Sequence, residues 1–278
     1  MTEPVEIGLL GFGEVGQIIG ACVTGDTNKI KAYDIRFSDT ASSPFLAAES
    51  SPRIKVMHSA AELAAHSAIV FSAVTAEQTE SACASIADHI QVGTWFVDLN
   101  SASPAAKTAS ANRINHNGGL YVEVSVMSPV PPKQLGTPNT KVYSELYGQA
   151  SAAKMCRSVL VKGVEALLLE SLVAARTYGV ERTVLSSLDD LFPGPNWPEL
   201  ARYMIGRTLE HGGRRAEEMR EVAKTVSGAH LTPSMSLATA QVQDWAKHHP
   251  HVQEQIALDD VLDALRNIAS RTNEGSQA

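Results

Sequence analysis

The chain has 278 residues, of which 44% are hydrophobic and 19% are charged, and its formal net charge is −7. This length and composition are typical of a globular protein with two domains. The acidic balance argues against a nucleic-acid partner, and the lack of a run of 18 apolar residues argues against a membrane partner. The three cysteines are widely spaced and match no metal or disulfide pattern, so we expect no metal and a reducing, cytoplasmic setting.

Short apolar runs alternate with helix-like segments through the first half of the chain. The predicted strands are 5–12, 29–35, 54–58, 68–74, 94–99 and 120–126, and the predicted helices are 14–25, 59–66, 77–90 and 104–117. Ser103 followed by Pro104 is a typical helix start, because the hydroxyl caps the helix and proline suits its first turn. This alternation predicts an α/β domain with a mostly parallel sheet and helices on both faces.

The second half of the chain lacks strand signals. Residues 128–140 contain four prolines and are predicted to be a loop. An unbroken stretch of about 30 residues then runs from residue 150 to Gly179, a residue type that commonly ends a helix. Further helices are predicted over 181–191, 198–211, 213–226, 234–248 and 252–270. We therefore expect an all-α domain over 151–278 that begins with a long interdomain helix.

Three glycines follow the first predicted strand at the spacing of a dinucleotide-binding loop. Gly11, Gly13 and Gly16 open the first predicted helix, and Asp34 ends the next strand. In this context the glycines allow a tight turn, a close approach of the pyrophosphate and close helix packing, while the acid binds the adenosine ribose. The first domain, residues 1–150, is therefore predicted to be a Rossmann domain. The residues expected to bind the cofactor are Gly11, Phe12, Gly13, Glu14, Val15, Gly16, Asp34, Arg36, Val74 and Thr75.

Asp34 and Arg36 give opposite indications about the cofactor. Asp34 favours NAD, because the 2′-phosphate of NADP would meet a like charge. Arg36, two residues further on, could receive that phosphate or stack on the adenine. We expect NAD and keep NADP as the alternative.

Four stretches carry a resemblance to a known family. They are "GLLGFGEVG" (8–16), "VDLNSASP" (97–104), "VEVSVMSP" (122–129) and "GQASAAKMCRS" (148–158). In these stretches the chain resembles the β-hydroxyacid dehydrogenases, which include 3-hydroxyisobutyrate dehydrogenase and, more distantly, 6-phosphogluconate dehydrogenase. The resemblance implies hydride transfer between a nicotinamide and the carbinol carbon of a hydroxy acid or related alcohol. It also implies a small-molecule substrate and a homodimer.

The family's catalytic lysine, a general acid/base, corresponds to Lys154. In the family this lysine precedes a helix glutamate and a helix-ending glycine, and Glu170 and Gly179 follow Lys154 by the matching 16 and 25 residues. The residues expected to contact substrate are Asn100, Ser101, Met127, Ser128, Ser158 and Lys162. Lys162 lies on the same long helix and is expected to bind an anionic group of the substrate. The alternative for Lys162 is a surface pair with Glu165, three residues further on.

The chain departs from the family pattern in several places. Ser158 replaces the family's asparagine, and Met127, Ser128 and Pro129 replace Ser-Gly-Gly in a carboxylate-binding loop. The stretch from 128 to 154 is also short, so the first domain is expected to be slightly truncated. These departures leave two alternatives open: an imine or ketimine reductase on the same scaffold, which Lys154 argues against, and a non-catalytic cofactor-binding regulator.

Overall fold

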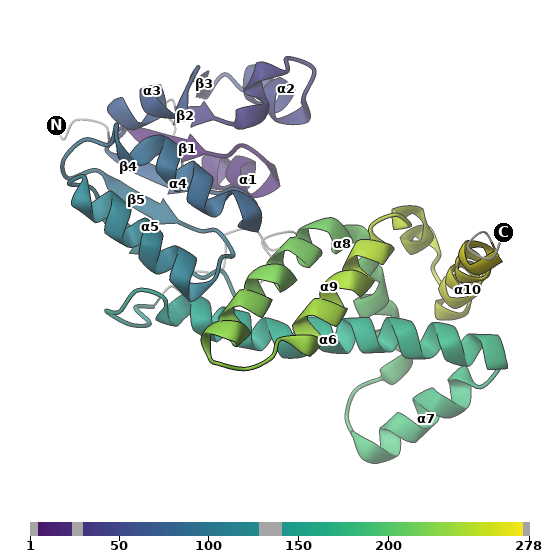
Figure 1. Ribbon diagram of the computed structural model, residues 1–278. Coiled ribbons are helices and arrows are strands. Elements are labelled where there is room, and N and C mark those ends of the chain that lie inside the picture. Colours follow the sequence, from purple (N-terminus) through teal and green to yellow (C-terminus); the bar gives the residue numbers. More distant parts are fainter. Residues whose placement is uncertain (1–4, 24–29, 128–140, 275–278) are drawn as a thin grey trace. The chain divides into compact units, whose positions relative to one another are not determined.

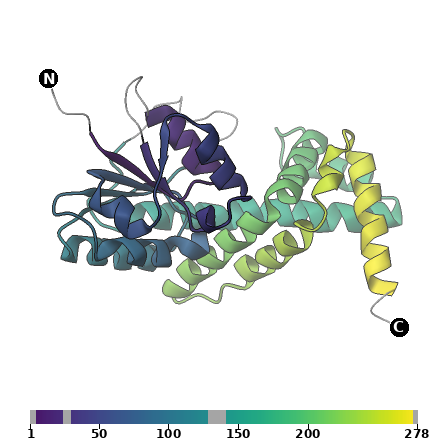
Figure 2. The same ribbon diagram turned by 90° about the horizontal axis from the view of Figure 1, so that it is seen from above.

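The computed structural model describes residues 5–23, 30–127 and 141–274. The chain divides into two compact units, Met1–Met155 and Cys156–Ala278. The first unit contains a six-stranded sheet, and the second contains helices only in its described residues, so the predicted order of an α/β Rossmann domain and an all-α region is confirmed (Figures 1 and 2).

All six strands of the first unit are parallel, in the order β3-β2-β1-β4-β5-β6. The strands are β1 (Ile7–Leu10), β2 (Ile30–Tyr33), β3 (Ile54–Val56), β4 (Ile69–Ser72), β5 (Trp95–Asp98) and β6 (Leu120–Glu123). The strand order reverses direction at β1, which lies between β2 and β4. In open parallel sheets a ligand crevice forms at such a reversal, outside the carboxyl ends of the strands.

Helices cover both faces of this sheet. They are α1 (Glu14–Val23), α2 (Ser43–Ser50), α3 (Ala60–Ala65), α4 (Thr79–Ala87) and α5 (Pro104–His116), with short 3₁₀ turns η1 (Ile35–Ser38) and η2 (Ala76–Gln78). Ser103 caps α5 as predicted, by accepting a hydrogen bond from the Ala106 N–H. Helix α2 was not predicted, although Ser42 caps it and Pro44 lies in its first turn.

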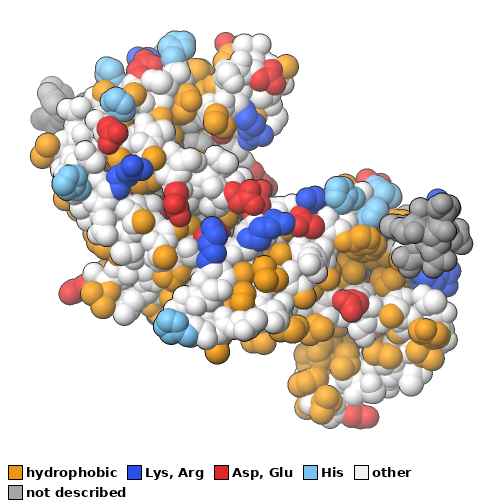
Figure 3. All heavy atoms as spheres, viewed as in Figure 1, with side chains coloured by type: hydrophobic (Ala, Val, Ile, Leu, Met, Phe, Trp, Pro, Cys, Tyr) orange, Lys and Arg blue, Asp and Glu red, His pale blue; other side chains and the backbone are white. Residues whose placement is uncertain are grey.

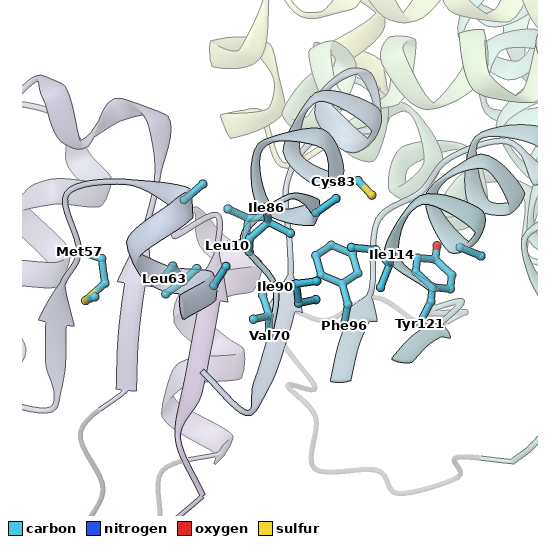
Figure 4. Packing of buried hydrophobic residues seen from close by; sticks show 14 residues of the cluster. Leu10, Met57, Leu63, Val70, Cys83, Ile86, Ile90, Phe96, Ile114 and Tyr121 are labelled. Atoms are coloured by element: carbon cyan, nitrogen blue, oxygen red, sulfur yellow. The ribbon is translucent and has the colours of Figure 1, made fainter. Parts of the chain in front are cut away.

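Apolar clusters fix the two layers of helices on the sheet. One cluster joins Leu10, Val70 and Phe96 of the strands to Ile86 of α4 and Ile114 of α5, as Figure 4 shows. The cluster on the other face contains Leu9 of β1 and Ile19 of α1. Each fully buried side chain of this size stabilises the fold by roughly 1.5–3 kcal/mol. The carboxyl ends of β1, β2, β4, β5 and β6 are therefore held side by side.

The long helix is confirmed as α6 (Gln149–Tyr178), and it ends at Gly179, whose φ is +70°. The remaining helices are α7 (Glu181–Leu191), α8 (Trp197–Gly228), α9 (Ser234–Ala246) and α10 (Leu258–Glu274), with the 3₁₀ turn η3 (Pro250–Glu254). Leu172 of α6, Ile205 of α8 and Leu262 of α10 belong to the core of this unit. Among the described residues between β6 and α6, none lies in a helix or strand.

Two helix boundaries in the second unit were predicted wrongly. The predicted helices 198–211 and 213–226 are a single helix, α8, which continues through Gly212 and Gly213. Gly212 is not a helix break. It lies where α8 packs closely against the backbone of α9, which leaves no room for a Cβ. The predicted helix 252–270 is divided into η3 and α10.

Candidate active site

The glycine loop has the shape that the sequence motif predicts. Gly11 has a φ of +92°, and a Cβ built there would lie 2.6 Å from the Ala73 carbonyl oxygen. A Cβ on Gly16 would lie 2.2 Å from the carbonyl oxygen of Gly11, so only glycine lets α1 start this close to β1. A Cβ on Gly13 would meet only the Arg36 guanidinium, at 3.8 Å. The loop therefore exposes its backbone at Gly13, ahead of the N-terminus of α1, where a pyrophosphate would bind.

The other residues predicted for this loop, Phe12, Glu14 and Val15, differ in burial. Phe12 is buried and packs edge-to-face on Phe37, with ring centroids 6.3 Å apart. Glu14 is exposed and Val15 is half-buried in the first turn of α1. Phe12 therefore anchors the loop to the core, Val15 packs against the same core cluster, and Glu14 lies at the surface.

Asp34 connects the end of β2 to the glycine loop. One carboxylate oxygen accepts a hydrogen bond from the Phe12 N–H at 2.8 Å, and the other accepts from the Arg36 N–H at 2.9 Å. The Arg36 Nε also lies 3.5 Å from this carboxylate, but the Arg36 side chain is 56% exposed. Asp34 thus shapes the loop through backbone bonds, and Arg36 presents its guanidinium beside the same loop.

Asn100 links the loops that follow β4 and β5. Its side-chain oxygen accepts a hydrogen bond from the Val74 N–H at 2.7 Å, and its amide nitrogen donates to the Ser72 hydroxyl at 2.9 Å. Asn100 is only 4% exposed. The structure therefore gives this predicted substrate residue a bracing role between the two loops, next to exposed Thr75.

The predicted catalytic lysine lies beside a predicted substrate residue. The Lys154 ammonium, in the second turn of α6, donates a hydrogen bond to the Ser101 hydroxyl at 2.6 Å. Ser101 follows β5 at the carboxyl edge of the sheet. Two positions 53 residues apart in the chain are thus brought into direct contact at the edge where the glycine loop lies.

The substrate loop after β6 is described only in part. Met127 is 46% exposed, and Ser128 and Pro129 lie outside the described residues. Glu123 is the last residue of β6, where this loop begins. Its carboxylate accepts hydrogen bonds from the N–H groups of Gly148 and Ser151, which lie after the loop.

A buried ion pair under the Ser101 loop was not predicted. The Lys107 ammonium lies 2.8 Å from Asp98 Oδ1, and neither residue is exposed to solvent. The Tyr121 hydroxyl donates to the other Asp98 oxygen at 2.7 Å, and burial together with this carboxylate raises the pKa of Tyr121. The Asn100 N–H also donates to Asp98, so the network fixes the start of the Ser101 loop.

The other two predicted substrate residues lie in the second unit, in a polar cluster between α6 and α8. The Lys162 ammonium lies 2.8 Å from Glu218 Oε1 and donates to the Ser158 hydroxyl at 3.2 Å. The Ser158 hydroxyl also donates to Glu218, at 3.3 Å. Lys162 is therefore paired with Glu218, and an anionic substrate group would have to compete with this carboxylate.

Glu165 pairs with Arg215 in the same cluster. Burial raises the pKa of Glu165 although Arg215 and Lys162 act in the opposite direction, and burial lowers the pKa of Arg215. The charges of this cluster balance, which limits the cost of burying it.

Within the described ranges, no group of three or more His, Cys, Asp or Glu residues has the arrangement of a metal site. No helix in the same ranges has the length and apolar character needed to span a membrane.

Comparison with known proteins agrees with this geometry. Residues 6–136 match the family model described as the NAD binding domain of 6-phosphogluconate dehydrogenase, and residues 175–246 match a domain of unknown function, DUF1932. A solved conserved hypothetical protein from Sinorhizobium meliloti 1021 is 34% identical, with a TM-score of 0.69, over 95% of this chain and 96% of its own.

Two further solved structures share the fold of this chain. A conserved protein of unknown function, described as structurally similar to 3-hydroxyacid dehydrogenases, is 26% identical over 91% of this chain and 100% of its own, with a TM-score of 0.65. Mycobacterium tuberculosis 3-hydroxyisobutyrate dehydrogenase, solved with L-serine, shares the fold at 15% identity, with a TM-score of 0.67 over 94% of this chain and 99% of its own.

The fold and the glycine loop define an NAD-binding protein of the dehydrogenase class. The chain belongs to one family with the conserved hypothetical protein from Sinorhizobium meliloti 1021, and it combines the NAD-binding domain of 6-phosphogluconate dehydrogenase with a DUF1932 region.

Proposed function

We propose that the protein is an NAD(P)-dependent oxidoreductase that acts on the CH–OH group of a hydroxy acid or a related alcohol. The observation that carries this proposal is the 2.6 Å hydrogen bond between Lys154 and Ser101 at the carboxyl edge of the sheet. A bound nicotinamide dinucleotide would supply or accept the hydride. The glycine loop and the N-terminus of α1 fit its phosphates, because Gly13 leaves the backbone open there.

Lys154 is proposed to move the hydroxyl proton of the substrate. An ammonium group can donate a proton to a carbonyl oxygen that becomes an alkoxide, and the neutral amine can take the proton back in the reverse reaction. Ser101 holds the Lys154 nitrogen through its hydroxyl and can exchange this bond for one to the substrate oxygen. Asn100 and Asp98 keep the Ser101 loop in place through the bonds described above.

The substrate is proposed to be small and anionic. Lys162 and Ser158 are its proposed anion ligands, and the anion would replace Glu218 as their partner. Met127 and Ser128 remain proposed as further substrate residues. Met127 is large and apolar where family members have a small hydroxyl residue, which favours a substrate with an apolar part.

We propose that the protein acts as a homodimer in a reducing, cytoplasmic setting. All three cysteines are free, which suits such a compartment. Leu160, Leu167 and Tyr178 of α6 are 72%, 55% and 81% exposed. At about 100° per residue they lie within roughly 20° of one another on one helix face, as expected of an interface stripe.

A substrate screen tests the proposed function. NADH and NADPH absorbance is followed with a panel of 2- and 3-keto acids and semialdehydes, with cyclic imines as a separate arm. The proposal predicts turnover of at least one carbonyl compound and no faster turnover of the imines. Turnover of imines alone would favour the reductase alternative. Tight NADH binding without turnover of any compound would favour a non-catalytic regulator.

A further inference from the structure

The first turn of α6 is capped by a residue from a different element. Helix α6 begins at Gln149 and is preceded by Gly148, which has no side chain to satisfy the helix N-terminus. The Glu123 carboxylate, at the end of β6, accepts from the Gly148 N–H at 2.5 Å and from the Ser151 N–H at 2.7 Å. These are the N-cap and N3 positions, whose donors a capping box would satisfy within the helix.

The backbone conformation and the close neighbours of Gly148 both favour glycine at this position. Its φ is +89°, and a Cβ there would lie 3.2 Å from Pro104 Cβ and 3.3 Å from the Pro104 carbonyl oxygen. The start of α6 is thus pressed against the start of α5 on one side and bonded to the end of β6 on the other. The Ser151 side chain, 1% exposed, completes the turn by donating to the Gly148 carbonyl.

Lys154 lies one turn after Ser151, so its direction follows from that of the first turn. The Lys154 ammonium then reaches Ser101, which follows the neighbouring strand β5. A carboxylate at a helix N-terminus is also favoured by the helix dipole, so Glu123 is held in place electrostatically as well as by its two bonds.

We infer that Glu123 is a positioning residue that caps α6 from the end of β6 and thereby holds the Lys154 ammonium against Ser101. Glu123 does not need to touch substrate or cofactor for this role. The inference rests on the proposed function only for its catalytic consequence, since the contact itself is a property of the chain without ligands.

The test is a double-mutant cycle read by amine labelling, without substrate. The protein is trace-labelled with acetic anhydride, and peptide mass spectrometry gives the labelling of Lys154 relative to exposed Lys55. Glu123→Ala is expected to raise this ratio by about tenfold, because two hydrogen bonds to a charged group are lost and the first turn opens more often. Ser101→Ala is expected to raise it as well.

The combination of the two changes is the decisive reading. If Glu123 acts by holding Lys154 at Ser101, the double variant labels no more than the stronger single variant. The inference would be overturned if the labelling increases of the two single variants multiply in the double variant. It would also be overturned if Glu123→Ala keeps the wild-type labelling ratio. Glu80→Gln, at an exposed position of α4, is the control for a lost carboxylate and should keep the wild-type ratio.

A milder variant covers the case in which Glu123→Ala does not fold. Glu123→Gln keeps one acceptor oxygen at the same length and is expected to give a ratio between the wild type and the fully uncapped helix. An unchanged ratio in this variant would also overturn the inference. Increased labelling without any dehydrogenase turnover would leave the positioning role intact and contradict the proposed function instead.

Discussion

Gly212 brings α8 into contact with the backbone of α9 near Gln243. A Cβ at Gly212 would lie 2.5 Å from the Gln243 carbonyl oxygen and 2.8 Å from the Lys247 N atom (the two helices run side by side in Figures 1 and 2). Neither atom belongs to a flexible side chain, so the helices would have to separate to accept a methyl group.

Gly212→Ala is therefore expected to destabilise the protein by about 1–3 kcal/mol, the usual cost of overpacking. The neighbouring Gly213 is a matched control, since its Cβ would meet only the Lys247 side chain, at 3.8 Å. Gly213→Ala should be neutral or stabilising by up to about 1 kcal/mol, because alanine favours helix. Urea unfolding of both variants checks the prediction, and equal effects would contradict this account of the helix contact.

Cofactor preference is predicted from Asp34 and Arg36. We expect NADH to bind more tightly than NADPH, because the Asp34 carboxylate repels a 2′-phosphate. Arg36→Gln should weaken NADPH binding by about tenfold and change NADH binding less than about twofold. Asp34→Asn should move the preference toward NADPH. Fluorescence titration with both cofactors measures these constants, and a larger loss of NADH than NADPH affinity in Arg36→Gln would refute the assignment.

If the proposed anion site is correct, substitutions of Lys162 and of Glu218 change the substrate KM in opposite directions. Lys162→Met should raise the substrate KM by about tenfold and leave the cofactor KM nearly unchanged, because a charged contact to the substrate is lost. Glu218→Gln should lower the substrate KM, since it removes the competing carboxylate 2.8 Å from the Lys162 ammonium. Steady-state kinetics of the two variants, with the best substrate of the screen, compare these effects. An unchanged substrate KM in Lys162→Met would show that Lys162 is purely structural.

Self-association is predicted from the exposed face of α6. Light scattering after gel filtration should give about twice the 29.7 kDa chain mass at micromolar protein. Leu167→Glu should shift the protein toward the monomer, because a charge on an apolar interface is costly.

Another group of hydrophobic side chains lies on the face of the second unit seen in Figure 3, over α7. Leu191 is the last residue of α7 and is 68% exposed. Leu191→Glu tests whether this second surface contributes to self-association. A monomeric wild type would contradict the prediction.

The sequence was informative where signals are local. The Gly11–Gly16 motif, the acid at Asp34 and the cap at Ser103 each act within a few residues or one strand-helix unit, and the structure confirms the loop and the helix start. The roles of Lys154 and Ser101 were predicted only through the family resemblance, and their direct contact was not predicted, since no local rule links positions 53 residues apart.

Residues whose role depends on tertiary packing were misread or missed. Gly212 and Gly213 resemble a helix break in the sequence, but close packing on α9 requires glycine at Gly212. Lys107 in an alanine-rich helix resembles a surface residue, although it is fully buried against Asp98. One signal was available: Lys107 shares the i, i+3, i+4 and i+7 spacing of the buried face of α5 with Ser110, Ala111 and Ile114.

Lys154 is proposed to move the hydroxyl proton of the substrate while the hydride is transferred at the edge of the nucleotide-binding sheet. The most direct test measures kcat and the NADH dissociation constant of Lys154→Met, with Lys55→Met as the control for a lost lysine. We predict that Lys154→Met lowers kcat by at least about a hundredfold, the usual contribution of a general acid/base, and retains NADH binding within about twofold. A Lys154→Met variant that turns over like the wild type would contradict the account.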